Sequence, residues 1–325
     1  MRVLVSGASG FLGSHVAETL IDQGHEVRAL VRRSSKTDFL ESRGVELCVA
    51  SLETGDGLEA ALEGVDAVVH GAAIVKARTP EEFHAVNAGG TERLLAAARE
   101  HCPGLRRFVL VSSLAAHGFG TNGNPRPVDA ESAPVTHYGH SKLAAERAVL
   151  AAADALPVTV IRPPAIYGPR DTEMFAFFQI VNRRVVTFLG SPNNRLSLIY
   201  VSDCARAVVA VLTKDHPSGR VYFVEDGRTY SQKEFAETVE RALGKRALKF
   251  SVPIGVVSVA AIGSELWGKL TNRAMMLTRD KVNELKEQQV CAGREIREEL
   301  GWEPEVDFEE GARRSVAWYR QEGWL

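Results

Sequence analysis

The first half of the chain alternates short apolar runs with segments of helical periodicity, and this alternation constrains the fold more than any other feature. The run RVLVSG (2–7) precedes the helical pattern GSHVAETLIDQG, which ends at Gly24. Similar apolar runs recur at residues 25–31, 45–50, 66–73, 107–113 and 157–168. A long helix is expected between 81 and 102. Strands separated by helices of this length predict right-handed β–α–β units and a parallel sheet covered on both faces.

Glycines follow the first apolar run at a regular spacing. GASGFLG places Gly7, Gly10 and Gly13 directly after the first strand and at the start of the first helix. Glycines there allow a tight turn and a close backbone approach to a pyrophosphate, whose charge is stabilised at a helix N-terminus. The spacing is GxxGxxG rather than GxGxxG, but the required strand–turn–helix context is present. We therefore expect a dinucleotide cofactor at this turn.

The composition disfavours other classes of protein. The 325 residues carry 39 Lys and Arg against 41 Asp and Glu, so no basic face for a nucleic acid is predicted. No apolar stretch reaches the roughly 20 residues of a membrane-spanning helix. The longest, VPIGVVSVAAIG (252–263), is predicted to be a core or pocket helix, with peripheral membrane contact as the alternative. Four dispersed cysteines and the lack of a visible signal peptide favour a cytoplasmic protein.

A tyrosine and a lysine stand four residues apart in HYGHSKLAAE (137–146), at the head of a predicted helix. Positions i and i+4 share a helical face, so Tyr138 and Lys142 are expected to point into the same space. A free tyrosine has a pKa near 10 and is a poor base at neutral pH unless a neighbouring cation favours its anion. The pair predicts either a proton-transfer site or, more simply, two surface side chains.

The motifs together resemble the extended short-chain dehydrogenase/reductases, within the NAD-dependent epimerase/dehydratase superfamily. After the glycine turn they occur in that family's order: VVHGAA (68–73), VNAGGTERLL (86–95), FVLVSSLAAHG (108–118), the YxxxK pair, IRPPAIYGP (161–169) and IYVSDCARAV (199–208). The resemblance covers essentially the whole chain. It implies an α/β fold with a Rossmann-type doubly wound parallel sheet, and an NAD(P)-dependent oxidoreductase.

The resemblance implies three catalytic residues. Tyr138 would be the proton donor or acceptor at the substrate oxygen, and Lys142 would bind the nicotinamide ribose and lower the tyrosine pKa. Ser113, five residues before Gly118, matches the hydroxyl that hydrogen-bonds the reacting carbonyl, with Ser112 as the neighbouring alternative. Acid–base assistance of this kind contributes roughly 10²–10⁴-fold in rate, while the cofactor supplies the hydride.

The resemblance also implies a set of cofactor-binding residues. In chain order, the predicted set is Gly7, Ser9, Gly10, Phe11, Leu12, Gly13, Arg32, Arg33, Lys36, Ser51, Leu52, Gly71, Ala72, Ala73, Asn87, Val111, Tyr138, Lys142, Pro163, Ala165 and Ile166. Ser51 stands where the family often has an aspartate that contacts adenine. No metal site is predicted, because His70, His117 and His140 lack ligand spacing and are expected in loops or at the surface.

A basic turn bears on the choice of cofactor. RALVRRSSK places Arg32, Arg33 and Lys36 after the second strand, with no carboxylate before Asp38. An arginine at that point accommodates a 2′-phosphate, whereas an acidic residue would bind the 2′-hydroxyl of NAD. NADP(H) is therefore favoured over NAD(H), and a solvated basic turn is the alternative.

Two departures from the family pattern concern the substrate. Members that act on nucleotide sugars commonly have an asparagine before the YGP motif, where this chain has Pro164, and an arginine where it has Leu196. Arg195 would substitute only if the register slipped by one. RPPAIYGPRD instead resembles the 3β-hydroxysteroid dehydrogenase and dihydroflavonol reductase branches. The 252–263 stretch, with Trp267, Met275 and Met276 beyond it, is expected to line a hydrophobic pocket or to be plain core.

The expected organisation follows from these motifs. Residues 1–168 are predicted to be mainly a Rossmann dinucleotide-binding domain, and 169–325 mainly a smaller substrate-binding portion, with 196–215 returning to the Rossmann core. SQKEFAETVERALG (231–244) is an amphipathic helix in which Ser231 and Glu234 form a capping box. The resemblance implies a homodimer through the helices after the fourth and fifth strands. KLAAERAVLAAA (142–153) is expected either to form such a face or to pack its alanines on the sheet.

The sequence thus predicts an NADP(H)-preferring oxidoreductase that interconverts a ketone and a secondary alcohol on a hydrophobic, sterol- or flavonoid-like molecule. One alternative is an NAD-dependent nucleotide-sugar epimerase or dehydratase. Another is a non-catalytic dinucleotide sensor that regulates a partner, although such a sensor needs no proton donor.

Overall fold

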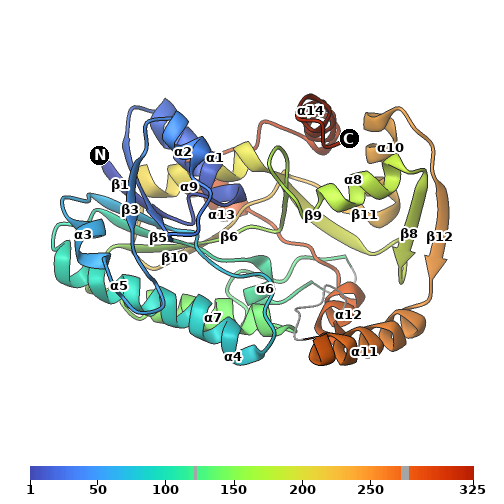
Figure 1. Cartoon of the computed structure of the whole chain (residues 1–325), viewed down its shortest axis with the longest axis horizontal. Coiled ribbons are helices and arrows are strands. Elements are labelled where there is room, and N and C mark those ends of the chain that lie inside the picture. The colour runs from blue at the N-terminus through green and yellow to red at the C-terminus, as the bar shows by residue number, and fades with distance from the viewer. Residues whose placement is uncertain (121–122, 272–277) are drawn as a thin grey trace.

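A seven-stranded sheet organises the molecule in the computed structural model, which describes residues 1–120, 123–271 and 278–325 (Figure 1). All neighbouring strands pair in parallel, in the order β10-β6-β5-β4-β1-β2-β3. The strands are β1 Arg2–Ser6, β2 Glu26–Val31, β3 Glu46–Val49, β4 Ala67–His70, β5 Arg107–Val111, β6 Val158–Arg162 and β10 Arg220–Phe223. The strand order reverses between β1 and β4, so the predicted Rossmann-type α/β fold is confirmed.

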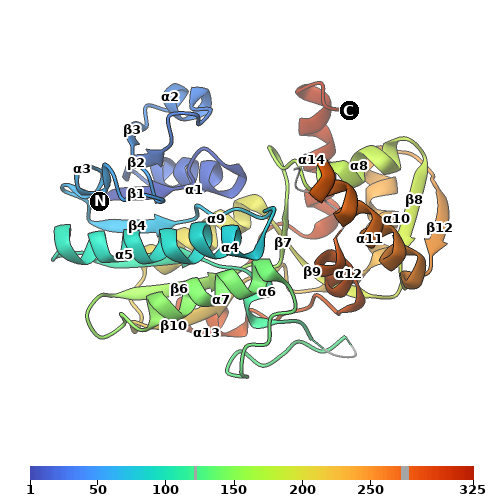
Figure 2. The same cartoon turned by 60° about the horizontal axis from the view of Figure 1, so that its bottom comes forward.

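Helices cover both faces of this sheet, because each central strand is apolar on both sides. Val3 and Val5 of β1 face one core, and Leu4 faces the other. The first core includes α1 Phe11–Asp22, α2 Asp38–Ser42, α9 Val201–Thr213 and α13 Arg294–Leu300. The second core includes α3 Leu58–Leu62, α5 Gly89–His101 and α7 His137–Leu150. Figure 2 shows α5 and α7 side by side on that second face.

The long helix expected between 81 and 102 is interrupted. It divides into α4 Pro80–Phe83, a π-helical turn η1 His84–Ala88, and α5. Single π turns are frequent at functional sites. Here the turn carries Asn87, whose side chain is buried. The sequence pattern alone did not indicate this break, because apolar periodicity continues across it.

A second group of elements lies beyond the carboxyl ends of the parallel strands. A three-stranded sheet is formed by β7 Ala165–Tyr167, β9 Arg195–Tyr200 and β11 Thr229–Ser231, and a two-stranded sheet by β8 Val185–Leu189 and β12 Leu248–Val252. Their helices are α8 Phe175–Asn182, α10 Gln232–Leu243, α11 Ile254–Thr271, α12 Arg279–Lys286 and α14 Phe308–Gln321. The remaining helix, α6 Leu114–His117, follows β5.

The second half of the chain contributes to both groups. Within 196–215, α9 packs in the core around β1, whereas β9 belongs to the three-stranded sheet. β10 and α13 also lie with the Rossmann elements. The predicted capping box is confirmed, with Ser231 Oγ accepting from Glu234 N at 3.1 Å and Glu234 Oε2 accepting from Ser231 N at 2.7 Å. Across the described residues, no helix combines the length and apolarity needed to cross a bilayer.

Candidate active site

The turns that follow β1 and β4 meet where the strand order reverses, at the place where doubly wound sheets form a ligand-binding crevice. Gly7 has a φ of 76°, and a Cβ on it would lie 2.8 Å from the backbone nitrogen of Ala72. The two turns are joined by hydrogen bonds from Gly71 N to Ser6 O, at 3.1 Å, and from Ala72 N to Ser6 Oγ, at 3.3 Å. Only a glycine satisfies both the backbone angle and the close approach at position 7. Crevices of this kind hold dinucleotides in doubly wound sheets.

The N-terminus of α1 faces this crevice in a form suited to an anion. Its N-cap is Gly10, so no side chain caps the helix, and its first turn carries no acidic residue. A Cβ on Gly10 would meet one heavy atom within 4 Å, Gly7 O at 3.2 Å. A Cβ on Gly13 would lie 2.0 Å from Gly7 O, so that glycine lets the helix pack against the turn. Free backbone N–H groups and the helix dipole therefore fit a pyrophosphate, as the glycine spacing predicts.

The basic turn after β2 is exposed. Arg32 and Ser35 close it through hydrogen bonds from Arg32 N to Ser35 Oγ, at 3.0 Å, and from Ser35 N to Arg32 O, at 2.9 Å. The side chains of Arg32, Arg33 and Lys36 have no hydrogen-bond or ion-pair partner within the described ranges 1–120, 123–271 and 278–325. Three unpaired cations beside the crevice are suited to a phosphate group.

The other predicted cofactor residues also lie at or near strand ends. Ser9, Phe11 and Leu12 follow β1, Gly71, Ala72 and Ala73 follow β4, Val111 ends β5, Pro163 follows β6, and Ala165 and Ile166 lie in β7. After β3, Ser51 Oγ accepts from Thr54 N at 3.1 Å, and Leu52 O accepts from Arg93 Nη1 at 2.9 Å. The carboxyl ends of parallel strands therefore bring most of the predicted set to one edge of the sheet.

Asn87 positions the backbone of this edge. Its Oδ1 accepts from Ile74 N at 2.8 Å, and its Nδ2 donates to Ile74 O and to Ser141 Oγ, each at 3.0 Å. Both amide hydrogens are therefore used, and only Oδ1 can accept a further hydrogen bond. The predicted cofactor residue thus ties the segment after β4 to α7, which carries Tyr138.

Two histidines expected in loops or at the surface are in fact buried. His70 lies between Ser6 Oγ, 2.6 Å from Nδ1, and Thr91 Oγ1, 2.9 Å from Nε2. Burial lowers the pKa of His70 to about 3, so the ring is neutral at physiological pH. Since Thr91 donates its own proton to Asn87 O, it accepts from His70, and Nδ1 accepts from Ser6. His117 is also buried, and its ring nitrogens lie near Ser132 Oγ and Pro127 O. Both histidines can be buried because hydrogen bonds satisfy the nitrogens of both rings.

Three residues of the predicted catalytic set meet where β5 ends and α7 begins. Thr136 caps α7 through a hydrogen bond from Gly139 N at 3.0 Å, which fixes Tyr138 in the first turn. Ser113 lies beside Tyr138, whose phenol pKa its hydroxyl lowers, and Ser113 Oγ accepts from Ala115 N at 3.1 Å as the cap of α6. Ser112 Oγ, by contrast, is buried without a partner among the described residues. The geometry therefore selects Ser113 over its neighbour.

Burial controls the ionisation of this set. Burial raises the pKa of Tyr138 to about 12, with the neighbouring Ser113 hydroxyl lowering it and the charge of Glu284 raising it. Burial lowers the pKa of Lys142 to about 8, partly opposed by Glu146. The predicted lowering of the tyrosine pKa by Lys142 remains a prediction, because burial is the largest cause of the net shift in this structure. The buried ammonium donates to Val111 O at 2.8 Å, and the loss of hydration dominates the titration of the phenol.

An ion pair supports α7 beneath these groups. Arg162 Nε and Nη2 donate to the two carboxylate oxygens of Glu146, at 3.0 and 2.7 Å, and both side chains are buried. Glu146 lies one helical turn after Lys142. The pair therefore fixes α7 against β6 and places a negative charge near the buried ammonium.

The residues at the positions relevant to nucleotide sugars have other roles. Arg195 Nε donates to Thr229 Oγ1 at 2.9 Å and Nη2 donates to Thr229 O at 2.7 Å, so its guanidinium is held against β11. Leu196 packs with an apolar cluster of the second group of elements. Pro164 offers no side-chain hydrogen bond. Positions 164 and 196 therefore lack the asparagine and the arginine that members acting on nucleotide sugars commonly have there. Met275 and Met276, expected beyond the apolar helix, lie outside the described residues.

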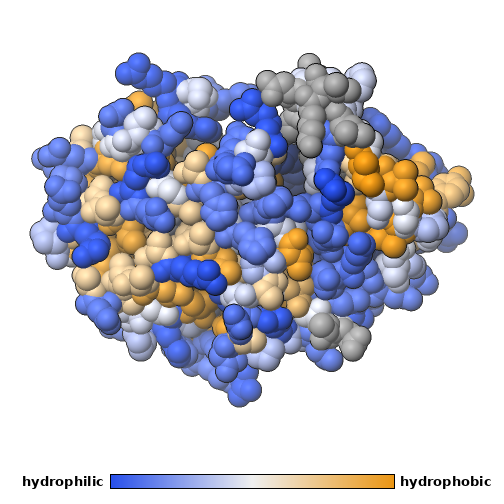
Figure 3. All heavy atoms as spheres, turned by 90° about the horizontal axis from the view of Figure 1, so that it is seen from below, coloured by the Kyte–Doolittle hydropathy of each residue, from blue (hydrophilic) through white to orange (hydrophobic). Residues whose placement is uncertain are grey.

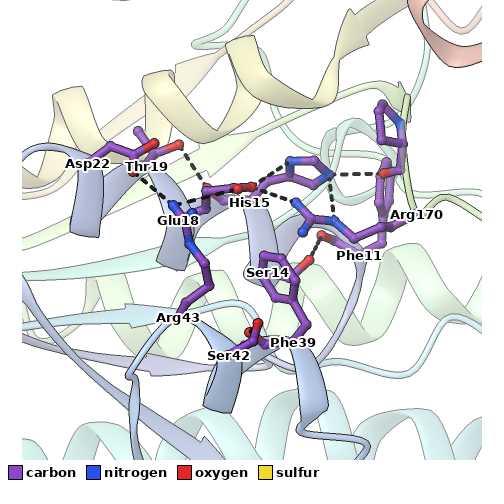
Figure 4. Close-up of polar contacts among 11 residues, drawn as sticks. Phe11, Ser14, His15, Glu18, Thr19, Asp22, Phe39, Ser42, Arg43 and Arg170 are labelled. Carbon is purple, nitrogen blue, oxygen red and sulfur yellow. Dashed lines mark hydrogen bonds and ion pairs between the residues drawn. The ribbon is translucent and has the colours of Figure 1, made fainter. Parts of the chain in front are cut away.

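A polar cluster that the sequence did not signal ties the segment after β7 to α1 (Figure 4). His15 Nε2 lies 3.0 Å from Pro169 O, and Arg170 Nη2 donates to Glu18 Oε2 at 2.9 Å. The Arg170 guanidinium also lies 4.2 Å from the centre of the Phe39 ring. Burial, reinforced by Arg170, lowers the pKa of His15 to about 4, so the ring is neutral. The helix that faces the crevice is thereby joined to the second group of elements.

Doubly wound sheets hold dinucleotides at this edge, and Tyr138 and Ser113 beside it are suited to deliver a proton and to hold an oxygen. Residues capable of holding a metal are not grouped together anywhere in the described chain. Fold and site together are those of NAD(P)-dependent enzymes of the extended short-chain type.

Comparison with known proteins gives the family. The chain belongs to the NAD dependent epimerase/dehydratase family, whose model matches residues 3–224. It is 32% identical over 324 residues to a ceramide reductase of Caulobacter vibrioides, covering 99% of this chain and 96% of the relative. It is 30% identical over 345 residues to a 3 beta-hydroxysteroid dehydrogenase/Delta 5→4-isomerase of Mycobacterium tuberculosis, covering 98% and 90%. A UDP-glucose 4-epimerase of Vibrio cholerae is 28% identical over 333 residues, covering 98% and 95%.

Solved structures agree with this assignment. The crystal structure of gox2253 has a TM-score of 0.83 and 27% identity, covering 100% of this chain and 99% of that one. A UDP-glucose 4-epimerase of Thermus thermophilus, in complex with NAD, has a TM-score of 0.78 and 25% identity, covering 98% and 99%. The predicted family and the NAD(P)-dependent enzyme class are confirmed, and the relatives include both reductases and epimerases.

Proposed function

We propose that this protein is an NADP(H)-preferring oxidoreductase that interconverts a ketone and a secondary alcohol on a hydrophobic, lipid-like small molecule. The observation that carries the proposal is the position of the Ser113 hydroxyl beside Tyr138, whose phenol burial keeps protonated at neutral pH. Reduction of a carbonyl requires a proton donor beside a group that holds the carbonyl oxygen. Tyr138 and Ser113 supply these two functions.

The roles of the side chains follow from their positions. A nicotinamide dinucleotide held along the glycine turn would supply the hydride. Ser113 would donate a hydrogen bond to the carbonyl oxygen, and Tyr138 would transfer its phenolic proton to the same oxygen as negative charge develops there. Lys142 uses one ammonium hydrogen on Val111 O, so two remain for the ribose hydroxyls. In the oxidative direction, Tyr138 would accept the proton.

The preference for NADP(H) rests on the basic turn. Arg32, Arg33 and Lys36 are exposed, and their side chains lack partners within the described residues. The 2′-phosphate of NADP(H) would be an anionic partner for these three cations, whereas the 2′-hydroxyl of NAD(H) carries no charge for them to neutralise. NAD(H) is the alternative cofactor, because the similar Thermus thermophilus epimerase was solved in complex with NAD.

The proposal of a hydrophobic substrate rests on the residues at the two positions where nucleotide-sugar enzymes commonly have polar side chains. Leu196 and Pro164 are apolar, and the guanidinium of Arg195 is already bound to Thr229. Two of the relatives are named for ceramide and for a 3β-hydroxysteroid, both apolar molecules. The second candidate is a nucleotide-sugar epimerase, favoured by the Vibrio cholerae relative.

A substrate panel separates the two candidates. NADPH oxidation would be followed with apolar ketones, including a 3-ketosteroid and a long-chain 3-oxo lipid, and epimerisation would be followed with UDP-sugars. Turnover of at least one apolar ketone, abolished in Tyr138→Phe, supports the proposal. Epimerisation of a UDP-sugar by protein that retains NAD, with no ketone turned over, contradicts it.

A homodimer through α5 and α7 is part of the proposal. The two helices lie side by side on one face of the sheet, and their outer positions include the small side chains Ala96, Ala144, Ala148 and Ala151. Small residues let helices of two copies approach closely. Light scattering of Ala148→Glu, compared with the wild type, tests this interface, and an unchanged mass contradicts it.

A further inference from the structure

A large apolar surface remains exposed on the elements farthest from the Rossmann sheet. It consists of Val185 of β8, Leu248 and Phe250 of β12, and Val256, Val259 and Trp267 of α11, which are 37 to 71% exposed. We call it the α11–β12 face. Figure 3 shows orange spheres gathered on this side, at the right of the view. The prediction that 252–263 is a core or pocket helix holds only for its inner residues, such as Val257 and Ala261.

The pairing of β8 with β12 explains this exposure. Leu248 pairs with Val185 and Phe250 with Thr187, so these side chains share the outer face of a two-stranded sheet. Val186 and Phe188 point the other way, into the cluster with α8 and α10. α11 covers only the far end of the outer face, where it contacts Val252 and Leu189.

The charges at the start of β8 and β12 are of one sign. Arg183, Arg184 and Arg246 are exposed at the start of β8 and β12, and a hydrogen bond from Leu248 N to Arg184 O, at 2.9 Å, brings the two segments together. In the part of the chain that the structure describes, none of the three arginine side chains has an acidic partner. Their positive charge therefore borders the outer apolar side chains of the two strands.

The nearby carboxylates are directed elsewhere. Lys249 points to the opposite face of β12, where Glu240 holds it at 2.9 Å. Residues 254–264 of α11 contain no charged residue, and Glu265 beyond them pairs with Arg279 at 2.8 Å. A surface of aliphatic and aromatic side chains with an unneutralised basic border complements one kind of partner, an anionic lipid surface.

We propose that the α11–β12 face docks onto anionic lipid bilayers. The apolar side chains enter the boundary between headgroups and acyl chains, the arginines contact lipid phosphates, and Trp267 lies at headgroup depth, where tryptophan is enriched. The docking stands on the face alone and does not depend on the proposed reaction.

Helix α12 links the docked face to the candidate active site. α11 packs against α12, and Asp280 of α12 accepts a hydrogen bond from the backbone nitrogen of His137, at 2.7 Å. His137 directly precedes Tyr138. Insofar as the proposed function holds, docking would bring Tyr138 close to the membrane that contains a hydrophobic substrate.

Co-sedimentation of the full chain with vesicles tests the docking, in the absence of substrate and cofactor. The probes are vesicles of phosphatidylcholine alone and of phosphatidylcholine with phosphatidylglycerol. We expect binding to the anionic vesicles, weakened by salt. Arg184→Glu with Arg246→Glu should weaken it by roughly fivefold or more per residue. Phe250→Ser with Val259→Ser should weaken it by about tenfold or more, since their apolar area no longer leaves water.

Matched controls change exposed residues far from the face. Val49→Ser removes an equally exposed apolar side chain, and Arg106→Glu reverses an exposed charge, and neither should alter binding. Thermal unfolding followed by circular dichroism confirms that each variant is folded. The fluorescence of wild-type protein should shift to the blue on anionic vesicles, and this shift should be lost in Trp267→Phe.

Two results overturn the proposal. One is wild-type protein that binds neither kind of vesicle. The other is a concentration-dependent dimer that Phe250→Ser dissociates without any vesicle binding, which would assign the face to a second copy of the chain. Because the assay contains no substrate, its failure leaves the proposed reaction standing. Loss of turnover in Tyr138→Phe, in turn, tests the reaction without testing the docking.

Discussion

The ammonium of Lys142 donates to the carbonyl oxygen of Val111 at 2.8 Å, which anchors the catalytic helix α7 to the last residue of β5. Because Ser112 and Ser113 directly follow Val111, this hydrogen bond ties the segment that carries Ser113 to the helix that carries Tyr138. The lysine thus has a structural role at the site in addition to the ribose contact proposed for it.

Removal of the phenolic hydroxyl should abolish proton transfer. Tyr138→Phe is expected to lower kcat by roughly 10²–10⁴-fold, since it deletes the acid–base group. Affinity for NADPH, measured by fluorescence titration, should change little, because the aromatic ring remains. Wild-type turnover by this variant on an authentic substrate would exclude Tyr138 as the proton donor.

The pH dependence should report Lys142. Its pKa is lowered to about 8 from an ordinary value of 10.5, whereas that of Tyr138 is raised to about 12. The rate of reduction and the affinity for NADPH should therefore fall as pH rises above about 8, where Lys142 loses its charge. Lys142→Met should show low activity without this limb, and a wild-type profile that stays flat to pH 10 would contradict the assignment.

Lys142 should also make the free energy of unfolding depend on pH. Its contribution to stability should rise with pH, whereas activity should fall. The folded state binds the proton of Lys142 more weakly than the unfolded chain, so the unfolded chain holds more protons between about pH 8 and 10.5. The contribution of Lys142 to the free energy of unfolding therefore increases with pH over that window. Urea denaturation across the window, compared with Lys142→Met, isolates this contribution.

The basic turn should select between the two cofactors. Arg32→Ser with Arg33→Ser is expected to weaken NADPH binding by about 10- to 100-fold, because charge-assisted hydrogen bonds to the 2′-phosphate are lost. NADH binding should be nearly unchanged. The matched control is Arg43→Ser, whose guanidinium is paired with Asp22 at 2.9 Å. Equal losses for both cofactors in calorimetry would indicate that the turn does not recognise the 2′-phosphate.

Removing one member of the buried Arg162–Glu146 ion pair should lower the free energy of unfolding strongly. Arg162→Met leaves the Glu146 carboxylate buried without its partner and is expected to lower the free energy of unfolding by about 3–5 kcal/mol. Replacing both, as Arg162→Met with Glu146→Leu, should recover much of this loss. Denaturant titrations of the two single variants and the double variant measure the coupling. Additive losses would mean that the pair contributes no mutual stabilisation.

Much of the fold could be predicted because local signals agreed with the global topology. The alternation of apolar runs and helical periods predicted the parallel sheet, and Gly7, Gly10 and Gly13 marked its first crevice. Ser231 and Glu234 predicted their capping box from spacing alone. In each instance the residues that determine the structure are neighbours in the sequence.

The features that were missed depend on contacts between distant segments. The π turn at Asn87 is set by Ile74 and Ser141, which adjoin it only in the folded chain. The raised pKa of Tyr138 arises from burial, which no local motif reports. Likewise, 252–263 is apolar on both sides of its helix, so the pattern could not distinguish the buried side from the exposed one.

The contacts of Arg170 bear on how the binding of one ligand affects the binding of another. This residue belongs to the segment that leads into the second group of elements, yet it is held by Glu18 of the helix that faces the pyrophosphate crevice. A substrate that displaces this segment would strain the helix that is proposed to receive the dinucleotide. Occupancy of either site would then alter affinity at the other, and thermodynamic reciprocity requires the two factors to be equal.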